Sequence, residues 1–190
     1  MRKVFSFNMI ILDGFFEGPN REIDWHNVDK EFNDFAEQQL AEADLLLFGR
    51  TTYELMAQYW PTETVRKNDP IIANKMNAIP KIVFSKTLSK ADWNNTNLVK
   101  ENIAEEVSQL KHQKGKDIAK FGSSQMAATL MKSNLIDEYR IMINPVIIGS
   151  GNHLFKGIHE RLNMKLLKTK IFISGNILLY YQSDRKEQLL

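Results

Sequence analysis

The chain has 190 residues, of which 43% are hydrophobic and 25% are charged, and its formal net charge is +2. These values fit one globular domain with its own core, and they exclude a disordered chain and a strongly basic nucleic-acid-binding protein. The absence of cysteine excludes disulfides, thiol catalysis and cysteine-ligated metals. Because Ser6, Asn8 and Asp13 interrupt the apolar N-terminal segment and no apolar run approaches roughly 20 residues, we expect a cytoplasmic protein with no signal peptide and no membrane partner.

The first half of the chain alternates strand patterns with helix patterns. Residues 4–12 form an apolar run that predicts a buried strand, which Asp13-Gly14 ends before a loop. Apolar residues at helical spacing over 28–43 predict a helix that Asn27 caps. The pattern further predicts a strand at 45–48, a helix opened by a capping box of Thr51 and Glu54, a polar loop at 61–70, and strands at 81–84 and 98–99.

The second half continues the alternation and ends in a hairpin. Helices are predicted at 103–110 and 126–131, and strands at 118–121, 139–143 and 146–148. The lysine-rich stretch 111–120 is interpreted as a helix end and a turn, and the charged tail after Ser183 as frayed. Strands at 166–173 and 177–181 read as a hairpin across Ser174-Gly175-Asn176. We therefore predict a single α/β domain over 1–190, with a mostly parallel mixed sheet flanked by helices in three layers and an antiparallel C-terminal hairpin.

Three segments share one pattern, which we call a junction. In each, a predicted strand ends, residues with hydroxyl side chains follow together with a glycine or a cation, and a helix or turn then begins. Helix N-termini present free backbone N–H groups and the positive end of the helix dipole, which suit phosphate. The junctions comprise Gly49, Arg50, Thr51 and Thr52, then Ser85, Lys86 and Thr87, and finally Gly122, Ser123, Ser124 and Gln125.

Each junction taken alone is more often a helix cap or a surface salt bridge than a ligand site. In a parallel sheet, however, the carboxyl ends of the strands lie along one edge, where ligands bind. Three such junctions on one edge therefore predict a site for an extended ligand with several phosphates.

Motifs for other chemistries are incomplete or missing. Gly149-Ser150-Gly151 begins a dinucleotide fingerprint, but Leu154 stands where the third glycine belongs. There is no glycine-rich loop for nucleoside triphosphates and no Gly-x-Ser-x-Gly nucleophile elbow. The four histidines have no ligand spacing, so we expect no metal site.

These segments resemble the dihydrofolate-reductase-like superfamily. The most specific are Gly-Arg-Thr-Thr-Tyr-Glu at 49–54 and Ile-Asp-Glu at 136–138 followed by Asn-Pro-Val-Ile-Ile-Gly-Ser-Gly at 144–151. The segments 12–14, 83–88 and 121–124 add to the likeness, which spans most of the chain. Together they are most similar to the riboflavin-biosynthesis reductase C-terminal-domain family and its uncharacterised bacterial relatives.

The resemblance implies NADPH as the cofactor and a homodimer as the assembly. It implies that the junction at 50–52 contacts phosphates, that 85–87 flanks the adenosine 2′-phosphate, and that 122–125 takes the pyrophosphate. The chain departs from the family at Ile11, where a serine is usual, and at Phe121, where an acid is usual. True folate reductases carry a carboxylate on the first helix, for which Asp29, Glu31 and Asp34 are candidates without a convincing match.

The leading hypothesis is an NADPH-dependent reductase that transfers hydride to a small heterocyclic or carbonyl substrate. Asp13 is the candidate catalytic residue, as a substrate-orienting or proton-handling group, although an aspartate before glycine is also typical of a simple turn. The alternatives are a nucleotide-binding module without turnover and a true dihydrofolate reductase.

Overall fold

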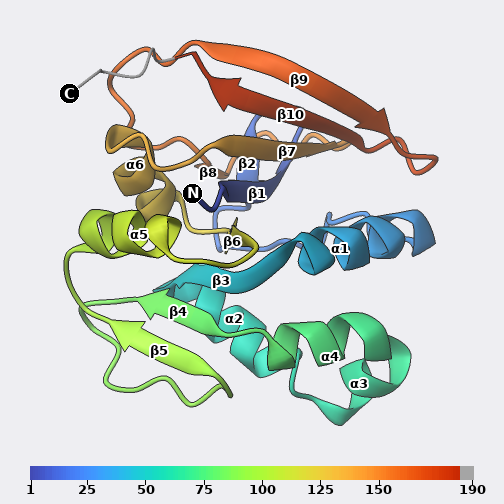
Figure 1. Cartoon of the computed structure of the whole chain (residues 1–190). Helices are drawn as coiled ribbons and strands as arrows, with labels where there is room; N and C mark the ends of the chain where they lie inside the picture. Colours follow the sequence, from blue (N-terminus) through green and yellow to red (C-terminus); the bar gives the residue numbers. More distant parts are fainter. Residues whose placement is uncertain (185–190) are drawn as a thin grey trace.

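The computed structural model describes residues 1–184, which build one large sheet flanked by helices (Figure 1). The sheet has eight strands in the order β5-β4-β3-β6-β1-β7-β10-β9. The strands are β1 (Val4–Ile11), β3 (Ala43–Gly49), β4 (Lys81–Phe84), β5 (Thr96–Val99), β6 (Asp117–Phe121), β7 (Glu138–Asn144), β9 (Met164–Ile171) and β10 (Ile177–Ser183).

The direction of the strands divides the sheet into two parts. Each adjacent pair from β5 to β7 is parallel, whereas β10 pairs antiparallel with both β7 and β9. The predicted α/β fold, with its mostly parallel sheet and C-terminal hairpin, is therefore confirmed. Parallel strands need crossover connections, and the helices that supply them cover both faces of the sheet.

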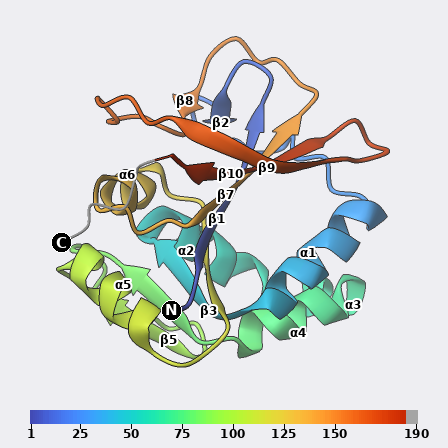
Figure 2. The same ribbon diagram turned by 45° about the horizontal axis from the view of Figure 1, so that its top comes forward.

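Two apolar cores lie on the two faces. One core, which includes Phe7, Phe48 and Phe121, lies under α1 (Lys30–Glu42), α2 (Arg50–Tyr59) and α4 (Pro70–Ala78). The other, which includes Leu47 and Ile118, lies under α5 (Ile103–His112) and α6 (Ser124–Lys132). Figure 2 shows α1 and α4 on one side of the strands and α5 and α6 on the other. No helix among residues 1–184 is long and apolar enough to cross a bilayer.

The predicted loop at 61–70 was wrong. The segment contains the short helix α3 (Glu63–Asn68), and α4 starts at Pro70. The Thr62 side chain accepts a hydrogen bond from Val65 N and caps α3, while the fixed backbone angle of Pro70 suits the first position of a helix. Polar composition concealed α3 because only Val65 of this helix is buried.

Both predicted helix caps were also wrong. α1 is capped by Asp29, whose carboxylate accepts from Phe32 N at 2.8 Å, so Asn27 is not the cap. α2 starts at Arg50 after Gly49, which gives no side-chain cap, and Thr51 therefore lies inside the helix. Asn27 instead forms hydrogen bonds with Asn144, Ser174 and Asn176.

The predicted strand at 146–148 does not exist. Pro145 has no N–H to offer to a ladder, and Asp13 takes the N–H groups of Ile148 and Gly149. Instead, the loops after β1 and β7 form a second, two-stranded sheet from β2 (Phe15–Glu17) and β8 (Asn152–His153). The sequence patterns did not indicate these two short strands.

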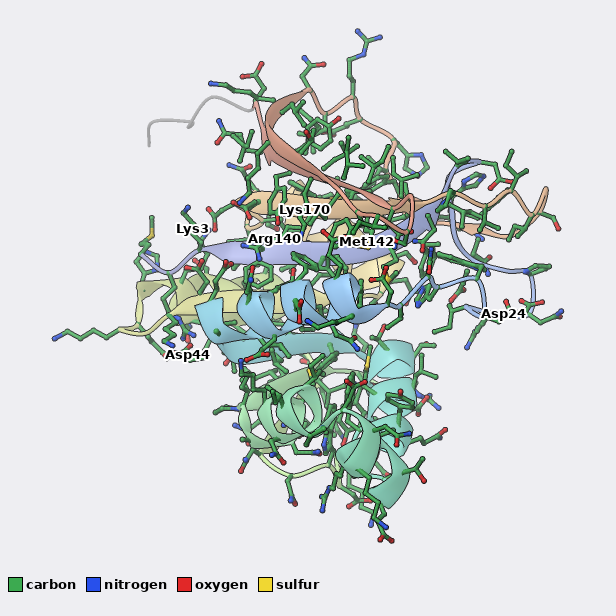
Figure 3. All side chains as sticks on the ribbon, turned by 90° about the vertical axis from the view of Figure 1, so that its right-hand side faces the viewer. Lys3, Asp24, Asp44, Arg140, Met142 and Lys170 are labelled. Atoms are coloured by element: carbon green, nitrogen blue, oxygen red, sulfur yellow. The ribbon has the colours of Figure 1, made fainter. Side chains whose placement is uncertain are left out.

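The predicted hairpin of β9 and β10 is confirmed, and Arg140 of β7 packs beneath it. The Arg140 guanidinium lies 3.7 Å from the centroid of the Phe5 ring and bonds Glu138 and Glu42. Figure 3 shows Arg140 between the sheet and α1. Of the tail after Ser183 that the sequence predicted to be frayed, Asp184 is held by a hydrogen bond from its N to Asn163 O at 2.8 Å, and residues 185–190 lie outside the described residues.

The lysine-rich stretch 111–120 is partly as predicted, because α5 ends at His112 and a turn follows. Its two terminal lysines are nevertheless buried. Lys111 pairs with Asp137 at 2.6 Å. Lys120 is 0% exposed, and within residues 1–184 the only hydrogen bond of its side chain is a 3.5 Å contact from Nζ to Asn8 Oδ1. Burial lowers the pKa of Lys120 to about 7, because the ammonium loses its hydration without gaining a carboxylate.

Replacing Lys120 with methionine tests this burial. Burial lowers its pKa from 10.5 to about 7, so between these values the unfolded chain binds more protons, and the stability of the wild type rises with pH. We expect Lys120→Met to raise the free energy of unfolding by about 2 kcal/mol near pH 6, and we expect that gain to fade by about pH 10. Urea unfolding across this range measures the difference, with the exposed Lys114→Met as the matched control. A gain in the free energy of unfolding that stays constant with pH would contradict the lowered pKa of Lys120.

Candidate functional site

The three predicted junctions meet at the carboxyl edge of the parallel sheet. In the strand register, Gly49 at the end of β3 lies opposite Phe84 at the end of β4. On its other side, Phe48 of β3 lies opposite Phe121 at the end of β6. The segments that follow these three strands are therefore neighbours in space, as the sequence predicted.

The first and third junctions are in direct contact. A Cβ placed on Gly49 would overlap the Ser123 side chain, and a Cβ placed on Gly122 would overlap the Thr52 side chain. Gly122 also has φ +57°, a left-handed conformation that side chains other than glycine adopt at a cost. Two reciprocal contacts, each between a glycine and a hydroxyl residue, thus hold the N-terminus of α2 against the N-terminus of α6.

The first and second junctions are linked by a hydrogen bond. Arg50 Nη1 donates to Thr87 Oγ1 at 2.6 Å, while Arg50 Nε donates to Glu54 Oε1 at 2.8 Å. Ser85 Oγ accepts from the backbone N–H groups of Thr87 and Leu88 at 3.2 and 3.0 Å, which closes a tight turn after β4. Glu54 thus pairs with Arg50 rather than completing a capping box with Thr51.

The third junction has an unusual backbone. Ser123 has φ 54° directly after the left-handed Gly122, and its Oγ accepts from Met126 N at 3.4 Å as the cap of α6. Consecutive residues with φ above zero are uncommon outside glycine, and they tend to occur at ligand sites. Ser124 and the exposed Gln125 then begin α6.

The donor set of these junctions fits a dinucleotide with several phosphates. The first N–H groups of α2 and α6 have no partner within their helices, and both helix dipoles present positive ends there. The exposed Arg50 and Lys86 add two cations, and the exposed Thr51 adds a hydroxyl. We call this set of residues (49–52, 85–87 and 122–125) the cradle. No group of three or more His, Asp or Glu side chains within residues 1–184 could hold a metal ion.

Asp13 lies at the end of β1 and fastens a loop. Its Oδ2 accepts from Ile148 N at 3.1 Å and from Gly149 N at 2.8 Å. Its Oδ1 is buried without a hydrogen-bond partner among the described residues. The carboxylate therefore clamps the segment after β7 to the end of β1, a role that the turn pattern of the sequence did not indicate.

Three asparagines that the sequence analysis did not connect fasten the segment before α1. Asn144 Oδ1 accepts from Asn27 N at 3.0 Å, and Asn144 Nδ2 donates to Ile10 O at 3.2 Å. Asn27 Nδ2 donates to Ser174 O, and Asn176 Nδ2 donates to Asn27 O. Asn144 and Asn176 are both 0% exposed. Only Asn144 lies at the end of a predicted strand, whereas Asn27 precedes a helix and Asn176 lies in a turn, so no local pattern linked the three.

The asparagines place Trp25 and His26 at the carboxyl ends of β1 and β7. The two rings contact edge to face with centroids 4.5 Å apart. Burial lowers the pKa of His26 to about 4, so the imidazole is neutral at pH 7. Trp25 Nε1 and Asn176 Oδ1 are buried without hydrogen-bond partners among the described residues, which leaves one donor and one acceptor available to a ligand or to water.

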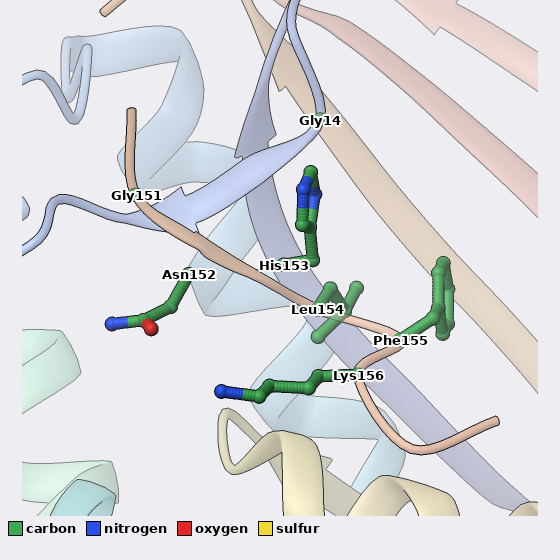
Figure 4. A pocket seen from close by; sticks show the side chains of 7 residues that line it. All are labelled: Gly14, Gly151, Asn152, His153, Leu154, Phe155 and Lys156. Atoms are coloured by element: carbon green, nitrogen blue, oxygen red, sulfur yellow. The ribbon is translucent and has the colours of Figure 1, made fainter. Parts of the chain in front are cut away.

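A pocket of about 480 Å³ opens beside the small β2–β8 sheet (Figure 4). It is formed mainly by the segment that runs through and beyond β8. The lining residues are Gly14, Gly151, Asn152, His153, Leu154, Phe155 and Lys156. The sequence analysis singled out only Gly151 and Leu154 of this segment, as parts of an incomplete glycine motif.

Comparisons with known proteins agree with this architecture. Residues 2–178 match the family described as the RibD C-terminal domain. The uncharacterized protein YyaP of Bacillus subtilis is 35% identical over 182 residues, which cover 95% of this chain and 94% of YyaP. A crystal structure of a putative riboflavin biosynthesis protein from Shewanella sp. PV-4 superposes with a TM-score of 0.73 at 22% identity, covering 96% of this chain and 99% of that one.

A dihydrofolate reductase has the same fold at lower sequence identity. The enzyme from Enterococcus faecalis, solved in complex with NADP(H), superposes with a TM-score of 0.64 at 14% identity. The alignment covers 96% of this chain and 97% of the reductase. The likeness to the dihydrofolate-reductase-like superfamily, expected from the sequence, is thereby confirmed for the fold.

The contact between Gly49 and Ser123 can be tested by a double-mutant cycle. Gly49→Ala should lower the free energy of unfolding by about 1–3 kcal/mol, because the added methyl overlaps the Ser123 side chain. In the Ser123→Gly background the same change should cost much less, since glycine removes the overlap and accepts the positive φ. Urea unfolding of the four proteins gives the coupling energy. Equal costs in both backgrounds would show that the two junctions are not packed as described.

Proposed function

The chain belongs to the RibD C-terminal domain family, and on this premise we propose that it is an NADPH-dependent reductase of a small heterocyclic or carbonyl compound. The observation that carries the proposal is the meeting of the three junctions in one cradle. A single helix N-terminus would not distinguish a ligand site from an ordinary cap. Two N-termini and a third turn, joined through Arg50, Thr87 and Ser123, match the several phosphates of one extended dinucleotide.

Each part of the cradle has a role in binding. The helix N-termini at 50–52 and 123–125 would bind the pyrophosphate through backbone N–H groups and hydroxyls. Arg50 and Lys86 would bind the adenosine 2′-phosphate, because a phosphate beside two exposed cations gains charge-assisted hydrogen bonds. This pair would favour NADPH over NADH.

When bound, NADPH supplies the hydride, and the protein supplies orientation and a dry environment. The carboxyl end of β1, next to β6, is where the reacting ring would meet the substrate. Asn144 holds Asn27 at this end of the sheet, so the neighbouring Trp25 and His26 would help to exclude water from the reacting ring. Asp13 stays a predicted orienting group, which would act by fixing the loop at 148–149.

No observation favours a true dihydrofolate reductase over this more general proposal. The three carboxylates considered for holding a pterin all have structural partners. Asp29 caps α1, Asp34 pairs with Lys30, and Glu31 accepts from Ile173 N at 2.9 Å. A folate substrate would have to displace one of these partners.

Nucleotide titration tests the proposal. We expect the fluorescence of NADPH to change on binding, and NADH to bind at least tenfold more weakly because it lacks the 2′-phosphate. Arg50→Ala should weaken NADPH binding roughly 10- to 100-fold, the usual range for one lost charged hydrogen bond. Lys114→Ala is the matched control, since Lys114 is exposed and precedes β6 at the opposite edge of the sheet.

The outcomes separate the alternatives. Failure of both nucleotides to bind would refute the reductase proposal. Tight NADPH binding without oxidation in a screen of carbonyl and heterocyclic compounds would instead support a nucleotide-binding module without turnover. Equal affinities for NADH and NADPH would refute the role given to Arg50 and Lys86.

We also propose a homodimer formed through the C-terminal hairpin. Core packing accounts for Leu178 and Tyr180, which are buried, but Ile171 and Ile173 are 74% and 97% exposed. β9 is also an edge strand, whose free backbone groups can pair with another chain. A second copy of the chain would cover the exposed isoleucines and pair with the free backbone groups of β9.

Light scattering coupled to size-exclusion chromatography tests this assembly. We expect a mass of twice the 22.0 kDa chain at micromolar concentration. Ile173→Lys should weaken the dimer at least tenfold, because burying an unpaired charge is costly. The exposed Lys114→Ala, which precedes β6 and lies outside the hairpin, should leave the mass unchanged. A monomeric wild type would refute the proposal.

A further inference from the structure

The pocket beside β8 has features of a small-molecule site that the cradle does not use. Its volume of about 480 Å³ lies within the range typical of ligand sites. It lies past the carboxyl end of β1, where Gly14 follows the strand. The Leu154 side chain, 2% exposed, fixes the pocket wall to the core under α6, so the pocket belongs to the α5–α6 face of the sheet.

The backbone around the pocket is held in place by several contacts. The His153 ring stacks on Phe15 with centroids 4.4 Å apart and an interplanar angle of 30°. Asn152 Nδ2 donates to Glu17 Oε1 at 2.9 Å. A Cβ on Gly151, which directly precedes β8, would overlap the backbone oxygen of Glu17 in β2. The backbones of the two segments are therefore in close contact at this glycine. The pocket is thus built by tertiary contacts and does not depend on a loose loop.

The side chains at the pocket combine aromatic rings with a free cation. Phe155 is 45% exposed, which is high for a phenylalanine, and the exposed His153 offers the ring face that Phe15 does not cover. Lys156 is exposed, and no carboxylate among the described residues pairs with it. Figure 4 shows Lys156 and Asn152 extending away from Phe155, so the pocket has an aromatic end and a polar end.

We infer that this pocket binds a planar aromatic anion, separately from the dinucleotide cradle. The aromatic ring of the ligand would pack against Phe155 and His153, since offset ring contacts add to the gain from apolar burial. Its carboxylate, or another anionic group, would bind Lys156 Nζ through a charge-assisted hydrogen bond. This site is additional to the proposed reductase function and does not depend on it.

A matched pair of probes tests the inference, namely 2-naphthoate and its neutral analogue 2-naphthamide. We expect 2-naphthoate to shift the backbone amide NMR signals of Gly14 and residues 151–156 in the intact chain. The neutral analogue should bind roughly 5- to 20-fold more weakly, because it loses the charged hydrogen bond to Lys156. Equal binding of the two probes would show only non-specific apolar contact and would overturn the inference.

Three variants locate the site. Lys156→Gln should reduce the affinity for 2-naphthoate to that of 2-naphthamide, whereas the exposed Lys165→Gln on β9 should not change it. Phe155→Ala should weaken both probes, since it removes the ring contact. An unchanged affinity in Lys156→Gln, or signal shifts confined to other residues, would also overturn the inference.

One further comparison separates the pocket from the cradle. Lys156→Gln should bind NADPH as the wild type does, and Arg50→Ala should bind 2-naphthoate as the wild type does. If NADPH and 2-naphthoate compete, the pocket is part of the dinucleotide site and the inference of a separate site fails. If NADPH does not bind at all, the proposed function fails while the naphthoate result still stands.

Discussion

The close approach of two helix N-termini is the constraint on which the arrangement at the carboxyl edge depends. α2 and α6 begin on opposite faces of the sheet, and their first residues can touch only where the strands between the faces end. Gly49 faces Ser123 and Gly122 faces Thr52 with no room for a further Cβ. Packing of this kind tolerates little change in volume. The two glycines therefore hold two positive dipole ends and their hydroxyls within the reach of one ligand.

Hydrogen bonds to irregular backbone order the other half of the edge. Beyond β1 and β7 the chain has no long ladder, so side chains take over the unpaired backbone groups. Asp13 binds two N–H groups of the segment after β7, and Asn144 binds the segment before α1. These polar side chains give fixed positions to the segment that carries Trp25 and to the loop that carries the pocket residues His153 and Lys156.

The buried cations of this fold differ in the partners of their charged groups. Arg140 and Lys111 lie in the interior with carboxylate partners at 2.6–2.7 Å, so their charges are compensated. The side chain of Lys120, the last residue but one of β6, has only the Asn8 amide as a partner within residues 1–184, and its lowered pKa reflects this difference. A buried lysine without a carboxylate lowers stability, and Lys120 lies two residues before Gly122, where the third junction of the cradle begins.

The amino-acid sequence by itself determined the alternation of strands and helices, the C-terminal hairpin and the three junctions. These depend on local periodicity and on residues at strand ends, which are readable one segment at a time. The sequence did not determine the cap at Asp29, the helix at 63–68 or the missing strand at 146–148, because neighbours distant in sequence or a single buried side chain decide them. The tertiary structure alone decided that Gly49 meets Ser123, that Asp13 clamps a loop and that Lys156 borders a pocket. The first two contacts join residues more than 70 positions apart, and the position of Lys156 depends on a loop that such long-range contacts fix. A local sequence pattern cannot encode contacts between residues so far apart in the chain.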